Sequence, residues 1–228
     1  MKPIQIAIDG PSGAGKSTMA KLLSKRLGVM YLDTGAMYRA VALKAIRMGI
    51  DTRDREKVCE ILPDLDIKIE YKDGNQQVLL DGEDVSGLIR TDEVSMGASN
   101  VSAIPEVRKK LVELQQKIAS NNNVVMDGRD IGTHVLPNAQ VKIFLTASSS
   151  ERARRRYLEL QEKGLLTKTF EELKQEIEQR DYNDSNRAAS PLRQAEDAVL
   201  LDTSNLSIEE SVDRIISIIK EKVGSDVL

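Results

Sequence analysis

Residues 10–18 read GPSGAGKST and directly follow the apolar run of residues 4–8. They fit the phosphate-loop pattern GxxxxGK(S/T), in which Lys16 and Ser17 close the loop. Glycine permits the unusual backbone dihedrals that turn N–H groups inward around a phosphate. The residues after Lys16 read as a helix, whose free N-terminal N–H groups also point at the anion. The stretch therefore predicts a strand, an anion-binding loop and a helix in direct succession, with a ligand-free glycine turn as the alternative.

Each part of this loop has an expected task. The Lys16 ammonium can reach the outer phosphates of a nucleotide, and the Ser17 hydroxyl can help to hold a magnesium ion. The candidate nucleotide-binding residues are Gly10, Pro11, Ser12, Gly13, Ala14, Gly15, Lys16, Ser17 and Thr18.

Length and composition favour an ordinary soluble enzyme. With 228 residues and 40% hydrophobic content, the chain can bury a full core as one large domain with an elaboration. Its formal charge of -3 provides no global basic field for a nucleic acid or an anionic membrane. Cys59 is the only cysteine, which excludes an intramolecular disulfide and predicts a buried small hydrophobic side chain.

No targeting or anchoring segment is expected. The run after Lys2 leads straight into the phosphate loop, so it does not read as a signal peptide. The sequence has no stretch of about 18 apolar residues, which predicts a cytoplasmic protein. Because no long apolar stripe remains once the core is assigned, we expect a monomer that binds neither membranes nor nucleic acid polymers.

Short apolar segments alternate with helical ones, which favours a parallel α/β sheet with crossover helices. The expected strands are Ile4–Asp9, Val29–Leu32, Val124–Asp127, Val141–Thr146 and Ala198–Asp202. Capping boxes mark three helix starts, at the pairs Ser148 and Glu151, Thr169 and Glu172, and Ser207 and Glu210. In the last helix an apolar stripe at helical spacing is expected to pack on the sheet, and it comprises Ile208, Val212, Ile215, Ile216 and Ile219.

The pattern changes between about Pro63 and Asn100. Residues 65–71 alternate between apolar and polar, Asp73-Gly74 resembles a hairpin turn, and the alternation resumes in residues 78–80. The segment therefore predicts an antiparallel β subdomain inserted into an α/β chain.

Phosphate loops serve several protein classes, and the sequence distinguishes among them. A GTPase would need a guanine-binding NKxD element, which this chain lacks, and its DxxG at residues 84–87 lies in the insert. A DNA-handling ATPase would carry basic or aromatic platforms, but aromatic residues make up 3% of the chain and tryptophan is absent. An enzyme that transfers phosphate to a small acceptor fits best.

Arginines outside the loop supply evidence for the acceptor side. Phosphoryl transfer between two phosphorylated molecules crowds negative charge at one point, and the planar guanidinium binds phosphate bidentately. Arg129 follows a buried strand end, where parallel sheets place their ligands. The other candidates are Arg39, Arg152, Arg154, Arg155, Arg156, Arg180 and Arg187. For the four between 152 and 156, a solvated charged helix face is the alternative, since Glu151 and Glu159 lie nearby.

Together with these arginines, several longer motifs resemble the cytidylate kinase family of nucleoside monophosphate kinases. The motifs are IAIDGPSGAGKST, LDTGAMYR, DGEDVSGLIRTDEV, PEVR, DGRDIGT, KIFLTAS, LQEKG, RD..D..NR..SPL and LDTSNLSIEE, and they span essentially the whole chain. The resemblance implies a three-layer α/β phosphate-loop kinase fold with a five-stranded parallel sheet. It also implies a single kinase domain, with a core at 1–62 and 101–228, a nucleoside monophosphate-binding insert at about 63–100 and a mobile lid at about 150–187.

The resemblance further implies transfer of the γ-phosphate of ATP to CMP or dCMP, with Mg2+ as cofactor. The positions that match catalytic residues are Lys16 for the donor, Arg39 and Arg129 for the acceptor phosphate, and Arg155 and Arg187 in the lid. The positions that match the acceptor site are Thr34, Tyr38, Arg39, Ser99, Arg108, Asp127, Arg129, Asp130, Arg180 and Asp184. Among these, Ser99, Arg108 and Asp130 would recognise cytosine, because a carboxylate accepts from its exocyclic amine and uracil offers a carbonyl there.

Some positions keep more than one interpretation. Ser17 stands where some family members have glycine, so a metal-binding hydroxyl is not a family requirement. Asp127 could orient water around magnesium or fix Arg129. The lone histidine, His134, is not expected to act as a base, because the acceptor phosphate is already ionised near neutral pH.

Two other functions remain as alternatives. One is a phosphate-loop kinase of the same fold that acts on UMP, AMP or a non-nucleotide, and the proposed cytosine-binding residues argue against it. The other is a non-catalytic ATP-binding module, which would leave the acceptor arginines without a purpose.

Overall fold

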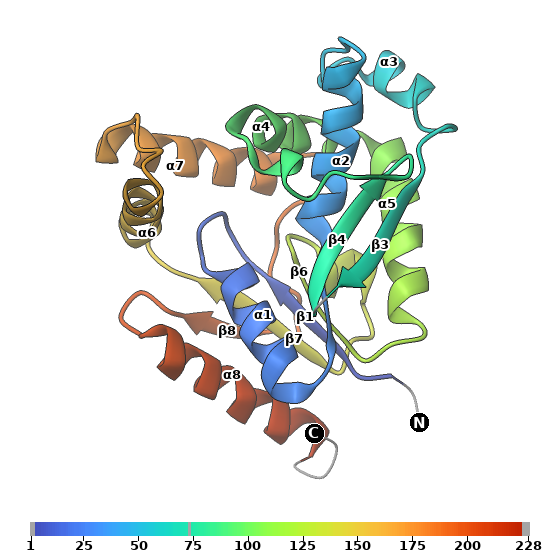
Figure 1. Cartoon of the computed structure of the whole chain (residues 1–228). Helices are drawn as coiled ribbons and strands as arrows, with labels where there is room; N and C mark the ends of the chain where they lie inside the picture. Colours follow the sequence, from blue (N-terminus) through green and yellow to red (C-terminus); the bar gives the residue numbers. More distant parts are fainter. Residues whose placement is uncertain (1–2, 73, 225–228) are drawn as a thin grey trace. The chain divides into compact units, whose positions relative to one another are not determined.

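The computed structural model describes residues 3–72 and 74–224 (Figure 1). Its larger sheet has five strands in the order β2-β6-β1-β7-β8, and β1 pairs in parallel with both β6 and β7, as β7 does with β8. The strands are β1 (Gln5–Asp9), β2 (Met30–Asp33), β6 (Val124–Gly128), β7 (Val141–Thr146) and β8 (Val199–Asp202). All five expected strands are present, and their bounds agree with the prediction to within one residue.

The chain divides into two compact units. The first contains the described residues up to Tyr31 and from Asn122 onward, and the second is Leu32–Asn121. The expected insert at about 63–100 falls inside the second unit, together with helices on either side of it.

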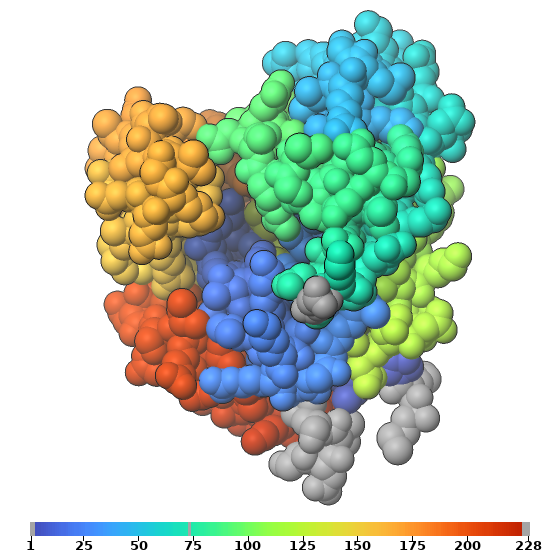
Figure 2. Space-filling view, viewed as in Figure 1, coloured from blue at the N-terminus to red at the C-terminus, as the bar shows by residue number. Residues whose placement is uncertain are grey.

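The core of the first unit lies between the sheet and two helices, α1 (Lys16–Leu27) and α8 (Ile208–Val223). Figure 1 shows both helices running across one face of the strands, and Figure 2 shows the surface of α8 adjoining that of α1. Apolar side chains from both helices join those of β1, β6 and β7 in one buried cluster. This cluster fixes the end of β1 and the start of α1, so it also fixes the loop between them.

The apolar stripe of α8 was predicted in part correctly. Val212, Ile215 and Ile219 are buried, and Ile216 packs against the same core at partial exposure. Ile208, the first residue of the helix, is exposed. Ile218, which was not part of the predicted stripe, is buried in the core.

The remaining helices of the first unit are α6 (Ser149–Glu162), α7 (Phe170–Asn186) and the π-helical turn η2 (Ile131–Val135). Reciprocal capping boxes are present at the starts of α7 and α8, as predicted. The box expected for α6 is wrong in one half: Ser148 accepts from the Glu151 backbone, but the Glu151 carboxylate binds Arg154 and Arg155 instead. Charge attraction along the helix therefore outcompetes the cap.

The second unit combines an antiparallel sheet with helices. Its strands β3 (Ile67–Lys72) and β4 (Asn75–Leu80) form the expected hairpin, and a short third strand, β5 (Glu83–Asp84), was not predicted. Asp73 of the expected turn lies outside the described residues. The helical elements are α2 (Thr34–Arg47), α3 (Arg55–Glu60), η1 (Leu88–Arg90), α4 (Asp92–Val101) and α5 (Pro105–Ala119).

Cys59, expected to be buried, is only half-buried, because it lies on the short helix α3, where Val58 takes the buried position. Within residues 3–72 and 74–224, none of the helices has both the length and the hydropathy needed to span a membrane.

The first residue of the phosphate loop allows a test of the fold. Gly10 has φ of 147°, and a Cβ there would lie 1.9 Å from the Leu145 carbonyl oxygen. We expect Gly10→Ala to lower the free energy of unfolding by about 3 kcal/mol or more. Gly28→Ala is the matched control, since Gly28 has φ of 66° with nothing within 4 Å, and about 1–2 kcal/mol is expected there. Urea denaturation measures both, and equal losses would contradict the close approach.

Candidate active site

The phosphate loop joins β1 to α1, as the sequence predicts. Gly10, Gly13 and Gly15 all have positive φ, which is the backbone conformation that glycine adopts without strain. The side chain of Arg152 crowds Gly13, since a Cβ at that position would lie 3.3 Å from Arg152 Cβ. The loop is therefore shaped by its glycines and enclosed by a residue of α6.

Lys16 begins α1 and is 5% exposed. Its Nζ donates a hydrogen bond of 2.7 Å to the carbonyl oxygen of Pro11, inside the same loop. Burial, and next the Arg129 guanidinium, hold the pKa of Lys16 well below its ordinary value, while Asp127 opposes this shift. A phosphate bound at the loop would favour the charged form, because a nearby anion raises the pKa of an ammonium.

Asp127 lies at the carboxyl end of β6 and connects three elements. Its Oδ2 accepts from the Ser17 hydroxyl at 2.7 Å, and its Oδ1 accepts from the Tyr31 hydroxyl at 2.9 Å. The sequence left open whether Asp127 fixes Arg129. Arg129 donates to Asp184 at 2.8 Å, and against the effect of burial the charges of both Asp184 and Asp127 raise its pKa. Asp127 therefore holds the start of α1 against β6, and its carboxylate lies beside the candidate metal-binding hydroxyl.

A row of alternating charges follows Arg129. Asp184 on α7 accepts from Arg129 Nε and lies 4.0 Å from Arg187, and Arg187 lies 3.6 Å from Asp130. All four side chains are at most 19% exposed. Burial alone would raise the pKa of Asp184, but Arg129 and then Arg180 hold it below its ordinary value. The first unit thus brings together most of the sequence-predicted site residues that it contains.

Arg152 is the functional candidate that the prediction undervalued. Its side chain is 6% exposed, and its Nη1 lies 2.8 Å from the Ser12 carbonyl oxygen and 2.6 Å from Asp181 Oδ2. Asp181 Oδ1 in turn accepts from the Ser12 backbone N–H at 3.3 Å. Arg152 and Asp181 therefore hold Ser12 from both sides, and we call these three residues the loop clasp.

The other arginines of α6 differ from Arg152. Arg154 and Arg156 pair with Glu151 and Glu159 of the same helix and are partly or largely exposed. Arg155 is half-buried, and its Nη2 donates to the Thr203 carbonyl oxygen at 2.7 Å. A weak sequence signal could have identified Arg152: it lies in the first turn of a helix, where a cation is unfavourable unless a partner offsets it.

The second unit holds the remaining predicted residues, beginning with the start of α2. Asp33 caps this helix and accepts from the Ala36 backbone and from Arg90 at 2.9 Å. Burial opposes ionisation of Asp33, but Arg39 and then Arg90 hold its pKa below the ordinary value. Thr34 is buried immediately after the cap, and Arg39 lies on the same helix.

Tyr38 and Arg108 meet within this unit. The Arg108 guanidinium carbon lies 5.5 Å from the centre of the Tyr38 ring, and its Nη1 donates to the Ser102 carbonyl oxygen. The Ser102 hydroxyl donates to the Ser99 carbonyl oxygen at 2.8 Å. The structure thus connects Tyr38, Ser99 and Arg108, which the family resemblance assigns to one acceptor pocket.

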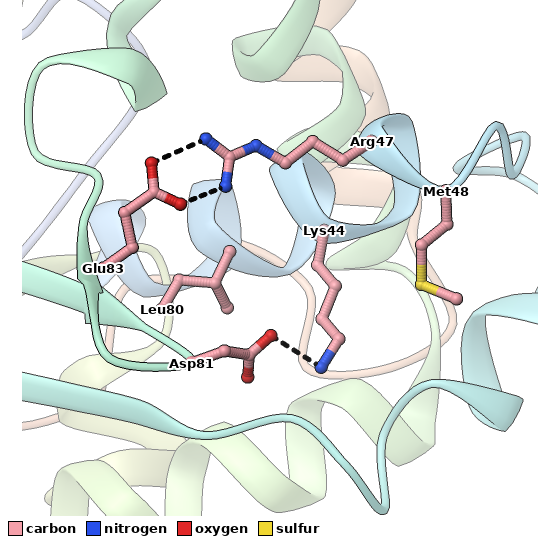
Figure 3. A pocket seen from close by; sticks show the side chains of 6 residues that line it. All are labelled: Lys44, Arg47, Met48, Leu80, Asp81 and Glu83. Carbon is pink, nitrogen blue, oxygen red and sulfur yellow. Dashed lines mark hydrogen bonds and ion pairs between the residues drawn. The ribbon is translucent and has the colours of Figure 1, made fainter.

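A surface pocket in the second unit has a structural explanation. Figure 3 shows that its charged side chains face each other: Arg47 binds Glu83 through two hydrogen bonds, and Lys44 binds Asp81 at 2.8 Å. These pairs attach the β4–β5 turn to α2.

Comparison with known proteins identifies relatives over the full length. A family model described as cytidylate kinase matches residues 6–221. A curated cytidylate kinase of Caldicellulosiruptor bescii is 55% identical over 227 residues, covering 100% of both chains. A curated cytidylate kinase of Limosilactobacillus reuteri (strain DSM 20016) is 52% identical over 96% of each chain.

Solved structures show a more distant likeness. An uncharacterized protein from Eubacterium ventriosum is 12% identical, with a TM-score of 0.52 over 96% of this chain and 99% of that one. A gluconokinase from Sinorhizobium meliloti is 14% identical, with a TM-score of 0.50 over 96% and 93% of the two chains. At such identity the likeness concerns the fold alone.

The loop clasp can be tested by its contribution to stability. Arg152→Ala would leave the Asp181 carboxylate and two carbonyl oxygens without their buried cationic partner. We therefore expect this substitution to lower the free energy of unfolding by about 3 kcal/mol or more. Arg156→Ala removes an exposed ion pair from the same helix and should change it by less than about 1 kcal/mol. Urea denaturation of Arg152→Ala, Asp181→Ala and the double variant measures the coupling within the clasp, and the same three variants of Arg156 and Glu159 measure it for the exposed pair. A clasp pair with no more coupling than the exposed pair would refute this interpretation.

Proposed function

The chain belongs to the cytidylate kinase family, and we propose how its residues divide the transfer of the γ-phosphate of ATP to CMP or dCMP. An acceptor phosphate oxygen attacks the γ-phosphorus as the bond to the leaving ADP breaks, and the product is CDP or dCDP. The observation that carries this assignment is the burial of Lys16 beside Arg129 at the loop that joins β1 to α1. Burial and Arg129 disfavour the charged form of Lys16, and substrate phosphates at the loop would favour it, because a nearby anion raises the pKa of an ammonium.

The phosphate loop is assigned to the donor. Its positive-φ glycines and the N-terminus of α1 suit the phosphates of ATP. Lys16 would exchange its bond to the Pro11 carbonyl for the outer phosphates, since an anion is a stronger acceptor than a neutral carbonyl.

Arg39 and Arg129 are assigned to the acceptor phosphate, each within its own unit. Both carry a guanidinium that remains charged and can bind phosphate bidentately. Arg129 is supported by its place after β6 and by the two bonds that orient its guanidinium, from Nε to Asp184 and from Nη1 to the Gly128 carbonyl. Arg180 and Asp184 are assigned to the sugar, and Arg155 and Arg187 to neutralising charge from the lid helices α6 and α7.

Cytosine recognition is assigned to Ser99, Arg108 and Asp130, with Tyr38 and Thr34 shaping the pocket. Arg108 is 4% exposed and fixed over the Tyr38 ring, while Asp130 is also 4% exposed. A buried carboxylate favours binding of cytosine, whose exocyclic amine can donate a hydrogen bond to it. Uracil offers no donor there, so its binding would leave the desolvated carboxylate without a hydrogen bond.

Magnesium is part of the proposal, and the residues at the loop fit it. Within the described residues no group of three or more His, Cys, Asp or Glu side chains could hold a metal ion. Mg2+ is usually held by one or two protein oxygens together with substrate phosphates and water, and Ser17 and Asp127 offer such oxygens 2.7 Å apart. When bound, the ion would neutralise phosphate charge. The other parts of the proposed mechanism consist of protein side chains and backbone groups that hold ATP and the acceptor in place.

No protein base is needed in this mechanism. The acceptor phosphate is ionised near neutral pH, and His134 is exposed and bonded to Thr133. Positioning and charge neutralisation therefore account for catalysis. A cytoplasmic monomer that binds no nucleic acid polymer completes the proposal, supported by the acidic composition.

An ADP-release assay with ATP and magnesium tests the substrate assignment. CMP, dCMP, UMP, AMP and GMP are offered separately, and we expect fast release with CMP and dCMP only. Lys16→Ala, purified in the same way, controls for contaminating kinases and should lose activity, because the outer phosphates lose their cation. A slow background with all five acceptors would leave the phosphate loop without its proposed acceptor, and fast release with UMP or AMP would identify a different kinase.

Asp130→Ala tests the recognition of cytosine. We expect the preference for CMP over UMP, measured as the ratio of the two kcat/KM values, to fall by about tenfold or more. Asp213→Ala, which removes an exposed carboxylate of α8 paired with Arg26, is the control and should leave the ratio unchanged. A ratio that stays the same in Asp130→Ala would show that cytosine is recognised elsewhere.

A further inference from the structure

Asp9 is a buried carboxylate that the proposed mechanism does not use. It ends β1, directly before the first glycine of the phosphate loop, and is 5% exposed. Its two oxygens accept from two consecutive backbone N–H groups far along the chain, Oδ1 from Ile131 at 2.8 Å and Oδ2 from Gly132 at 2.7 Å.

These two N–H groups belong to the start of η2, the π-helical turn. Within η2 the backbone bonds run five residues back, from Val135 to Asp130 and from Leu136 to Ile131. The first N–H groups of any helical turn have no acceptor inside the turn. Asp9 supplies the acceptor for two of them, across 122 and 123 residues of sequence.

The contact between Asp9 and η2 is closely packed at Gly132. A Cβ at Gly132 would lie 3.3 Å from Asp9 Oδ2 and 3.2 Å from Lys142 Cδ, so the turn approaches Asp9 as closely as its backbone allows. The residues immediately before the contact are Arg129 and Asp130, which are the proposed ligands of the acceptor phosphate and of cytosine. Any shift of the turn therefore moves both side chains.

The charge on Asp9 is maintained against its surroundings. Burial raises its pKa to about 6, while the two backbone N–H groups oppose the rise. Among the charged groups that face it, Asp130 raises this pKa and Lys16 lowers it, and the stem of Lys142 from β7 lies across Gly132. At neutral pH the carboxylate is thus ionised at a cost in desolvation, and only the ionised form offers acceptors on both oxygens.

We propose that Asp9 is a positioning residue for the reaction: its carboxylate fixes the turn that carries Arg129 and Asp130 to the strand from which the phosphate loop begins. The inference rests on the proposed roles of those two residues. Through its two hydrogen bonds, Asp9 connects the strand before the phosphate loop, which is assigned to ATP, to the turn after Arg129 and Asp130, which are assigned to the acceptor.

Asp9→Asn tests the proposal with a side chain of the same shape. Asparagine has one acceptor oxygen, and its NH2 group would face the other backbone N–H, so the turn loses one bond and meets a donor. We expect kcat/KM for CMP to fall roughly tenfold or more, since misplacement by about 1 Å can cost about a hundredfold. KM for ATP should change far less, because the glycines set the donor loop. Asp213→Asn, an exposed carboxylate on α8, should leave both values unchanged.

Gly132→Ala approaches the same contact from the opposite side and gives a second variant if Asp9→Asn does not fold. Its methyl group would press on Asp9 and Lys142, so the same selective loss with CMP is expected. Equal losses for ATP and CMP in both variants, in step with lost stability, would overturn the positioning role.

A pH titration followed by NMR provides a readout that does not depend on activity. Below about pH 6 Asp9 gains a proton and one N–H loses its acceptor, so the amide shifts of Ile131 and Gly132 should titrate together with a midpoint near 6. Asp9→Asn should abolish this titration. Because the pKa in the folded state is raised, the stabilisation by the proton is complete below about 3.8 and is lost as pH rises through about 6. Amide shifts of Ile131 and Gly132 that stay constant with pH and do not differ between the wild type and Asp9→Asn would refute the contact, whereas titrating shifts in a protein inactive with CMP would refute the proposed function alone.

Discussion

Lys16 and Arg129 place two positive charges in the buried edge of the five-stranded sheet, and the first unit is organised around holding them there. A buried cation without a partner is strongly unfavourable, so each of these two needs an oxygen acceptor within the protein. Lys16 takes the Pro11 carbonyl, and Arg129 takes Asp184. In the proposed mechanism, substrate phosphates would replace the carbonyl at Lys16 and share Arg129 with Asp184, because an anion is a stronger acceptor than a neutral carbonyl.

Carboxylates also collect at the ends of three strands, where they hold the elements that follow. Asp9 ends β1, Asp33 ends β2 and Asp127 is the penultimate residue of β6, and each is buried. Each accepts from an element that follows a strand: η2 for Asp9, α2 for Asp33 and the start of α1 for Asp127. In a parallel sheet the carboxyl ends lie at one edge, so short acidic side chains there can anchor the loops that bind ligands.

The sequence predicted the features that depend on neighbouring residues better than the contacts between residues far apart in the chain. The strands were predicted to within one residue because buried parallel strands are continuous apolar runs, and the phosphate loop because its glycines and Lys16 are local requirements. Arg129 was a candidate because it follows a buried strand end, whereas the resemblance to a family supplied the positions of Asp130 and Asp184. The contacts of Arg152 with Ser12 and of Asp9 with η2 were missed, because these partners lie more than a hundred residues away and leave no local pattern. Asp181, the other partner of Arg152, lies on a different helix, so no local pattern marks that contact either.

The errors near helix ends have a different, local reason. At Ser148 the expected capping box competes with two arginines of the same helix, and the Glu151 carboxylate binds both of them at about 3 Å. Ile208 belongs to the apolar stripe by spacing, but the first residue of a helix extends past the sheet it covers. A period or a motif predicts which side chains could meet. Which of them do meet is decided by competing charges and by where the neighbouring element ends, and for Arg152 that competition turned a residue of a charged helix face into a support of the phosphate loop.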